Sequence, residues 1–188
     1  NPKFIYNSAL IVENFYLNEE YKKVKNLLKS FKKKDEFYYW FRVKKEAQMI
    51  IKQKGRKEGI DFITSEFNKI DNPNLKMILD IANFYKNSKR YEKAINFYTK
   101  VLSSLDSDTE IKSDLLYRRG GSYERLGDYK KADKDLLYSL KINPEDAYIL
   151  NYLAYSWLER DYQIDEAMKM LEKAYELKSN DPYIIDSI

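Results

Sequence analysis

The sequence predicts an all-α fold in which about five helix-turn-helix repeats follow one another along the chain. The 188 residues include only five Gly and four Pro, too few turn residues for a β-rich fold of this length. Small, bulky apolar and aromatic residues recur at helical spacing, and the pattern returns every 34 to 38 residues. Hydrophobic residues make up 44% and charged residues 34%, which suits a long, well-solvated surface over an adequate core.

The clearest unit spans residues 113–146. Gly120 and Tyr123 lie three residues apart, the turn Leu126-Gly127-Asp128-Tyr129 follows, and the small residue Ala132 opens the next segment. Two antiparallel helices pack closely only where small side chains face each other, so we expect Gly120 to lie against Ala132.

The same pattern returns on both sides of this unit. Gly120 to Ala154 is 34 residues, Ala132 to Ala167 is 35, and Ala82 to Gly120 is 38, which predicts extra residues near 107–112. Residues 182–188 either begin a sixth unit or cap the fifth. If they begin a sixth unit, we expect the chain to be part of a longer array of repeats. The predicted repeats span residues 5–38, 40–73, 75–108, 113–146 and 147–181.

Three proline dipeptides mark expected helix boundaries. Asn72-Pro73, Asn143-Pro144 and Asp181-Pro182 each place a capping-type side chain beside a proline. We expect one helix to end and another to begin at each.

These patterns resemble the tetratricopeptide repeat (TPR), in which a large apolar residue, a Gly or Ala and an aromatic residue mark the first helix. The resemblance covers nearly the whole chain. The C-terminal stretch is similar to the repeats of long bacterial TPR proteins. It implies a right-handed α-solenoid, one superhelical domain over residues 1–188, and a scaffold that binds other proteins. It does not identify the partner.

The composition disfavours catalysis. The chain has no Cys and no His, which removes thiolate nucleophiles, the commonest zinc ligands and the usual near-neutral base. No apolar run approaches the roughly 18 residues of a membrane span. We therefore expect no enzyme activity, cofactor, metal or membrane insertion; the compartment, cytoplasmic or periplasmic, stays open.

Several clusters have an ordinary explanation that we prefer. Asp106, Asp108 and Glu110 lack the further ligands of a calcium loop and read as a solvated loop and helix start. Gly55 and Gly59 lack a phosphate-loop pattern and read as a turn and a packing residue. The basic run 29–34 reads as a charged helix end, and the net charge of +4 falls short of a nucleic-acid footprint.

The tyrosines also have a structural explanation. We place most of them at core positions of the repeats, with these as examples: Tyr85, Tyr91, Tyr98, Tyr123 and Tyr129.

The TPR resemblance implies a concave groove lined by the first helix of each repeat. Its N-terminal part is basic and rich in amides, and its C-terminal part is lined with tyrosine, which suits a peptide with acidic residues followed by apolar ones. Ordinary solvated helix faces are the alternative reading. The predicted groove residues are Phe41, Lys44, Gln48, Lys52, Lys76, Asn83, Lys86, Asn87, Tyr117, Gly121, Arg125, Tyr148, Asn151 and Tyr155.

One TPR subtype holds the terminal carboxylate of a heat-shock chaperone with Lys, Asn and Arg. The corresponding positions here are Lys44, Gln48, Asp80, Asp114 and Arg118. Asp80 and Asp114 would repel a carboxylate, so this subtype is disfavoured.

The leading prediction is a noncatalytic scaffold that binds a peptide or partner protein in its groove. The alternative is a structural solenoid segment whose exposed repeat ends mediate self-association or assembly.

Overall fold

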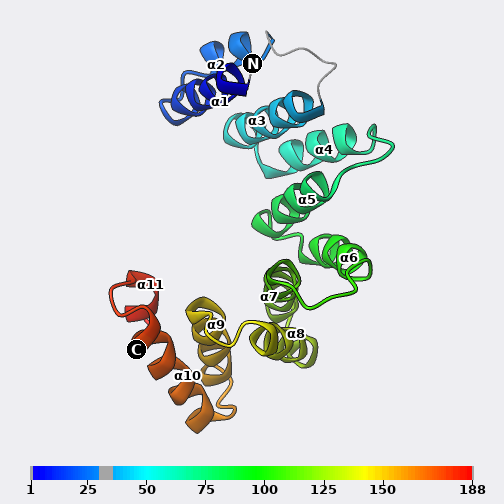
Figure 1. The fold of residues 1–188 in the computed structure, drawn as a ribbon. Helices are drawn as coiled ribbons and strands as arrows, with labels where there is room; N and C mark the ends of the chain where they lie inside the picture. Colours follow the sequence, from blue (N-terminus) through cyan, green and yellow to red (C-terminus); the bar gives the residue numbers. More distant parts are fainter. Residues whose placement is uncertain (1, 30–35, 188) are drawn as a thin grey trace. The chain divides into compact units, whose positions relative to one another are not determined.

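The computed structural model describes residues 2–29 and 36–187, and the regular secondary structure in these ranges is entirely helical (Figure 1). This confirms the predicted all-α class. The chain divides into two compact units, Asn1–Met77 and Ile78–Ile188, each of which is described by itself.

The first unit consists of two helical hairpins. Its helices are α1 (Pro2–Leu17), α2 (Tyr21–Lys29), α3 (Glu36–Lys54) and α4 (Arg56–Phe67). Helix α1 packs on α2, α3 packs on α4, and α2 contacts α3. A buried cluster lies between α1, α2 and α3 and consists of Val12, Val24, Leu28 and Met49.

The second unit is also built of helices. Its helices are α5 (Leu75–Asn87, which begins in the first unit), α6 (Tyr91–Leu102), α7 (Glu110–Glu124), α8 (Tyr129–Ile142), α9 (Ala147–Leu158), α10 (Ile164–Leu177) and α11 (Pro182–Ile185). From α6 to α11, each helix packs against the next in the chain (Figure 1). Leu136 joins Leu153, Trp157 and Ile184 in one core cluster, so this core extends from α8 to α11.

Helix pairs approach each other where the side chains are small, as the sequence predicts. A Cβ atom added to Gly120 would lie 2.9 Å from Leu136 Cγ and 3.2 Å from the Ala132 carbonyl oxygen, so α7 and α8 require a glycine here. In the first unit, a Cβ on Gly59 would lie 2.9 Å from the carbonyl oxygen of Ala47. Gly59 is thereby confirmed as a packing residue.

The turns after α1, α5, α7 and α9 share one backbone geometry. Each has a residue at positive φ shortly after the helix: Glu19 (59°), Lys89 (59°), Gly127 (76°) and Asp161 (52°). The turn after α9 has a second one, Gln163 (47°), just before α10. In each turn, the amide after the first such residue donates to a carbonyl five residues earlier; for example, Asp128 N lies 3.0 Å from the Tyr123 oxygen and Arg90 N lies 2.8 Å from the Tyr85 oxygen. This hydrogen bond is that of the Schellman motif, which satisfies carbonyls at the end of a helix.

Helix α8 ends at Asn143, as expected, but at Asn72-Pro73 and Asn143-Pro144 a later residue caps the start of the next helix. The backbone N–H of Met77 donates to the side chain of Asn74, and Asp146 accepts from the amides that open α9. The capping side chains therefore lie two or three residues after the expected Asn72 and Asn143, because each proline occupies the connection before the helix. Asp181 does cap the helix that begins at Pro182, as expected.

The core prediction for the tyrosines holds in part. Tyr85 and Tyr98 are buried, but Tyr129 is 41% exposed and its ring lies 4.5 Å from the Arg160 guanidinium. Tyr91 and Tyr123 are half-buried. The aromatic ring of Tyr129 therefore covers the surface ion pair that Arg160 forms with Asp133, instead of filling the core.

Two carboxylates of the second unit each pair with a different arginine of α7, one in a buried and one in an exposed setting. Asp135 of α8 is 4% exposed and accepts from Arg119 Nε at 2.6 Å and Nη2 at 2.8 Å. Asp114 has a side chain that is 51% exposed, and both of its oxygens accept from Arg118 Nε, at 2.9 and 2.8 Å.

We expect Asp135→Ala to destabilise the protein far more than Asp114→Ala. Removing Asp135 leaves a largely buried guanidinium unpaired, which costs about 3–5 kcal/mol, whereas an exposed pair contributes at most about 1 kcal/mol. Urea unfolding followed by circular dichroism measures both losses. Equal losses would show that the Arg119 pair does not stabilise the packing of α7 on α8.

We expect Gly127→Ala to lower the free energy of unfolding by about 1 kcal/mol, because an alanine is strained at positive φ. No other atom lies within 4 Å of the added Cβ, so the loss reports the backbone alone. The matched variant Asp161→Gly relieves the same strain and is expected to leave stability unchanged or raise it by up to about 1 kcal/mol. A stabilising Gly127→Ala would contradict this account of the turn.

Candidate functional site

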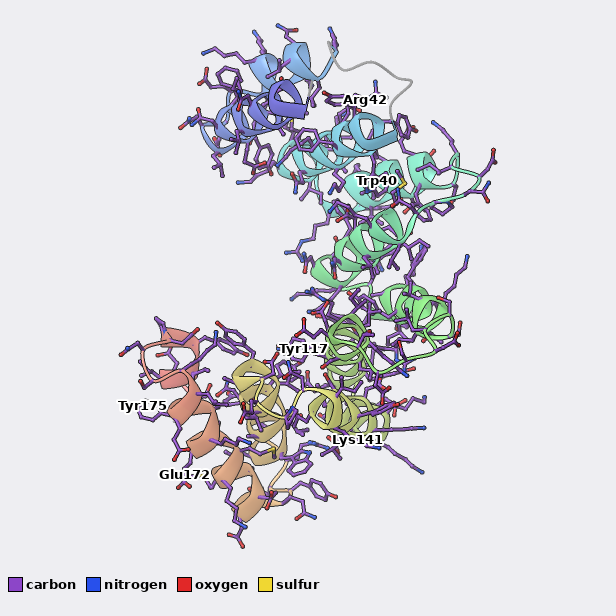
Figure 2. All side chains as sticks on the ribbon, in the orientation of Figure 1. Trp40, Arg42, Tyr117, Lys141, Glu172 and Tyr175 are labelled. Atoms are coloured by element: carbon purple, nitrogen blue, oxygen red, sulfur yellow. The ribbon has the colours of Figure 1, made fainter. Side chains whose placement is uncertain are left out.

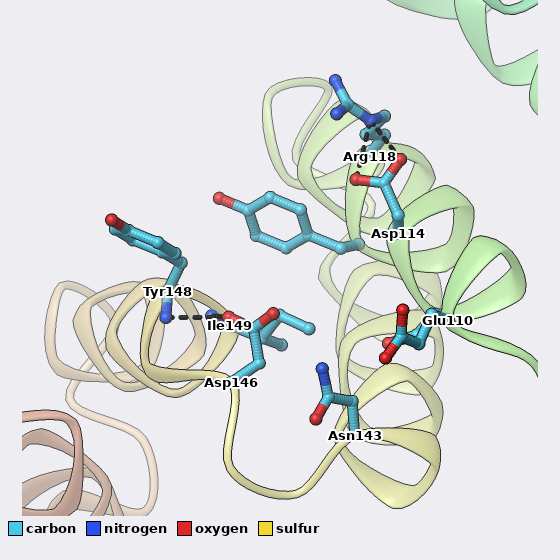
Figure 3. A pocket seen from close by; sticks show the side chains of 9 residues that line it. Glu110, Asp114, Arg118, Asn143, Asp146, Tyr148 and Ile149 are labelled. Carbon is cyan, nitrogen blue, oxygen red and sulfur yellow. Dashed lines mark hydrogen bonds and ion pairs between the residues drawn. The ribbon is translucent and has the colours of Figure 1, made fainter. Parts of the chain in front are cut away.

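Two of the pockets on the second unit have Tyr117 in their lining. The basic pocket, of about 280 Å³, is lined by Lys86, Asn87, Lys89, Tyr91, Tyr117, Gly121, Arg125 and Tyr152. The acidic pocket, of about 480 Å³, is lined by Glu110, Ser113, Asp114, Tyr117, Arg118, Asn143, Asp146, Tyr148 and Ile149 (Figure 3). Helices α7 and α9 contribute to both.

A pair of packed aromatic rings forms one wall of the basic pocket. Tyr117 and Tyr152 lie edge to face with their ring centres 5.6 Å apart. The Tyr152 hydroxyl donates to Glu124 Oε2 at 2.8 Å, which fixes the ring. A Cβ on Gly121 would lie 3.3 Å from that hydroxyl oxygen, so the glycine leaves room for the tyrosine. This wall is therefore held in place before any ligand arrives.

The positive charges of the basic pocket are poorly compensated. Burial lowers the pKa of the Lys86 ammonium, and the neighbouring guanidiniums of Arg118 and Arg125 act in the same direction, while Asp114 acts against them. Within the described ranges, neither Lys86 nor Lys89 has a carboxylate within ion-pair distance. Arg125 has only Glu124, at 3.4 Å. An anion would therefore be attracted to this pocket.

The acidic pocket is lined by three carboxylates, those of Glu110, Asp114 and Asp146, and by one guanidinium, that of Arg118. Asp114 pairs with Arg118, and Asp146 accepts from the backbone amides of Tyr148 and Ile149 at 2.9 and 3.2 Å (Figure 3). Burial raises the pKa of Tyr117 to about 12, so its hydroxyl stays neutral. This pocket therefore combines hydrogen-bonding groups with a net negative charge.

The structure brings seven of the predicted groove residues to these pockets or beside them. Tyr148 lines the acidic pocket, and Tyr155 is 49% exposed on α9 near Arg125. The other five line the basic pocket: Lys86, Asn87, Tyr117, Gly121 and Arg125. Figure 2 shows Tyr117 in the region between α7 and α9.

Two predicted groove residues of the second unit serve the fold instead. Asn83 Oδ1 accepts from the Tyr98 hydroxyl at 2.8 Å and from Arg118 Nη1 at 3.3 Å. Asn151 is 1% exposed, and its amide donates to Ser187 Oγ at 3.0 Å.

The remaining predicted groove residues belong to the first unit. On α3, Phe41 packs against the cluster around Met49, Lys44 and Gln48 are half-buried, and Lys52 is exposed. Gln48 Oε1 is buried without a hydrogen-bond partner. Lys76, at the start of α5, is exposed.

The groove prediction missed three residues of the basic pocket: Lys89, Tyr91 and Tyr152. Tyr152 shares a helical face with Tyr148 and Tyr155, because these residues are spaced by four and three positions. This spacing could have predicted that Tyr152 lies on the same surface as the two tyrosines that were selected. Lys89 and Tyr91 lie in the turn after α5 and at the start of α6, outside the first-helix positions to which the prediction was confined.

The other candidate sites do not assemble. Asp108 accepts from Lys112 Nζ at 2.9 Å and from the Tyr138 hydroxyl at 2.8 Å, and these hydrogen bonds lower the pKa of Asp108. Thr109, and not Asp108, caps α7. In the described ranges, no three His, Cys, Asp or Glu side chains converge as metal ligands, and no helix combines the length and apolar character of a bilayer span. The basic run at 29–34 lies outside the described residues apart from Lys29.

Family comparison identifies the repeats. Models described as tetratricopeptide repeats match residues 75–104 and 113–146. A TPR repeat-containing protein of Pseudomonas aeruginosa is 30% identical over 114 residues, and peptidyl-prolyl cis-trans isomerase D of Kluyveromyces lactis is 27% identical over 115. Each match covers 61% of this chain, but only 19% and 31% of the relatives' own lengths.

Solved structures share the fold at low sequence identity. MamA (AMB-1) has a TM-score of 0.65 at 17% identity, covering 93% of this chain and 99% of its own. A chain of the APC/C hetero-tetramer Cut9-Hcn1 has a TM-score of 0.64 at 15% identity, covering 94% of this chain and 34% of its own. YrrB, described as a TPR protein with an unusual peptide-binding site, has a TM-score of 0.61 at 10% identity, covering 96% and 89%. The helical hairpins, the repeat models and these relatives agree that the chain contains tetratricopeptide repeats.

Proposed function

We propose that this protein is a noncatalytic interaction scaffold that binds an extended segment of a partner protein along α5, α7 and α9. The observation that carries the proposal is the pair of pockets that share Tyr117. An extended peptide that crosses Tyr117 would place different side chains in the two pockets, as in other peptide-binding surfaces that alternate pockets. Helical-repeat arrays commonly use such extended surfaces for recognition.

The structural relatives support a protein partner. YrrB is described as having a peptide-binding site, and Cut9-Hcn1 is an assembly of several chains. The mild net charge of +4 also favours a protein over a nucleic acid, because nucleic-acid binding requires a strong basic patch. The α3 positions and Lys76 remain proposed contacts of the same kind.

The alternative function, self-association, has an observation of its own. A depression of about 620 Å³ on α10 and α11 is lined by Met168, Leu171, Glu172, Tyr175, Glu176 and Ile185. Met168, Tyr175 and Ile185 are each 44–48% exposed. Figure 2 shows Tyr175 and Glu172 on the outer side of α10. This apolar surface would fit a second copy of the chain or a neighbouring hairpin.

We expect the double variant Arg125→Glu/Tyr155→Ala to weaken peptide binding at least about tenfold, because it reverses one pocket charge and removes an exposed aromatic ring. The probes are peptides selected from a displayed library of random dodecapeptides, and fluorescence anisotropy measures Kd. The matched control is Lys134→Glu/Leu137→Ala, which makes the same kind of change at exposed positions of α8. Failure to select any peptide, or equal losses in both variants, would reject the proposed surface.

Multi-angle light scattering separates the two functions. We expect the mass of a single chain at every concentration, because the proposed binding surface needs no second copy. A mass that rises with concentration would favour the alternative. Tyr175→Asp, which puts a charge into the apolar surface of α10, would then restore the single-chain mass.

A further inference from the structure

The geometry points to the basic pocket as a binding site for one anionic side chain of the partner peptide, held between Lys86, Lys89 and Arg125 against the Tyr117–Tyr152 wall. This inference rests on the proposed function and names the chemical group that the site selects. The shared chemistry is an oxyanion, which either a carboxylate or a phosphorylated side chain supplies.

The charge balance of the pocket favours an external anion. Three cationic side chains line it, and its lining contains no acidic residue. Lys86 is half-buried, so its ammonium loses part of its hydration without gaining a carboxylate in return. The lowered pKa of Lys86 is the electrostatic result of that burial and of the nearby Arg118 and Arg125. An oxyanion beside Lys86 would offset all three effects.

The backbone geometry fixes the position from which one of these cationic side chains, that of Lys89, extends. Lys89 occupies the positive-φ position of the turn between α5 and α6, fixed by the 2.8 Å hydrogen bond from Arg90 N to the Tyr85 oxygen. Lysine is costly at this φ, and the equivalent turn after α7 uses Gly127. The lysine therefore brings a charge to the pocket rim at a position where glycine would be the more stable choice.

The neighbouring acidic pocket has the opposite charge balance, because Glu110, Asp114 and Asp146 line it with a single arginine. That arginine, Arg118, is paired with Asp114. An anionic side chain of the partner peptide is therefore attracted to the basic pocket and not to the acidic one.

The test is a double-mutant cycle on the selected dodecapeptides. Kd is measured for a peptide with a Glu, and for versions with Gln or phosphoserine in its place, against the parent and Lys86→Met, which keeps the unbranched stem but removes the charge. We expect the parent to prefer the Glu peptide to the Gln peptide about tenfold, and Lys86→Met to lose that preference. Phosphoserine that binds more tightly than Glu assigns a phosphate, and the reverse order assigns a carboxylate.

Two further variants and one NMR measurement keep the test independent of folding. Arg125→Gln alters a side chain that is 60% exposed and is expected to reduce the same preference. Lys100→Met, on the exposed surface of α6 and outside the pocket, is the matched control and is expected to retain it. NMR of the Lys86 side chain is expected to show its pKa rising when the Glu peptide binds and not when the Gln peptide binds.

The outcomes distinguish the two proposals. If peptides are selected but the parent binds Glu and Gln versions equally, or Lys86→Met retains the preference, the anion site is overturned while the scaffold function stands. If no peptide is selected, the scaffold function itself fails and the anion site fails with it.

Discussion

The close approach of paired helices at their smallest residues is the constraint on which the rest of the structure depends. At Gly120 the backbone of α7 comes so near to Ala132 and Leu136 that even one methyl group would collide. Ala154 and Ala167 are fully buried on the next pair of helices, α9 and α10. Because these contacts fix how each hairpin closes, they also fix which face of α7 and α9 remains available to carry Tyr117 and Tyr152.

The turns connect this packing to the pockets. The turns after α1, α5, α7 and α9 use the same hydrogen bond whether the residue at positive φ is Gly, Glu, Asp or Lys. A backbone geometry that tolerates any of these side chains allows the exposed residue to change without altering the hairpin. Lys89 illustrates the consequence, since it accepts backbone strain at a position that borders the basic pocket.

The helices and their contacts could be predicted from the sequence because small and bulky residues repeat with the helical period, which is a local signal. The capping residues Asn74 and Asp146 could not be placed from prolines alone, because a proline marks a connection without fixing its length. The pockets were predictable only in part. Selecting Asn151 instead of Tyr152 is an error of one residue. On a helix, neighbouring side chains differ in direction by about 100°, so Asn151 lies in the core whereas Tyr152 lines the pocket.

The distribution of charge separates stability from recognition. Arg118 and Arg119 are neighbours in sequence, but each is held by a different carboxylate, Asp114 or Asp135, and neither charge is left for a ligand. Lys86 has no such partner among the described residues, and burial makes its charge more costly than that of an exposed lysine. Paired charges position the helices, whereas an unpaired, half-buried charge contributes nothing to packing. Its presence on the face that the hairpins leave open is best explained by an anion that comes from outside the chain.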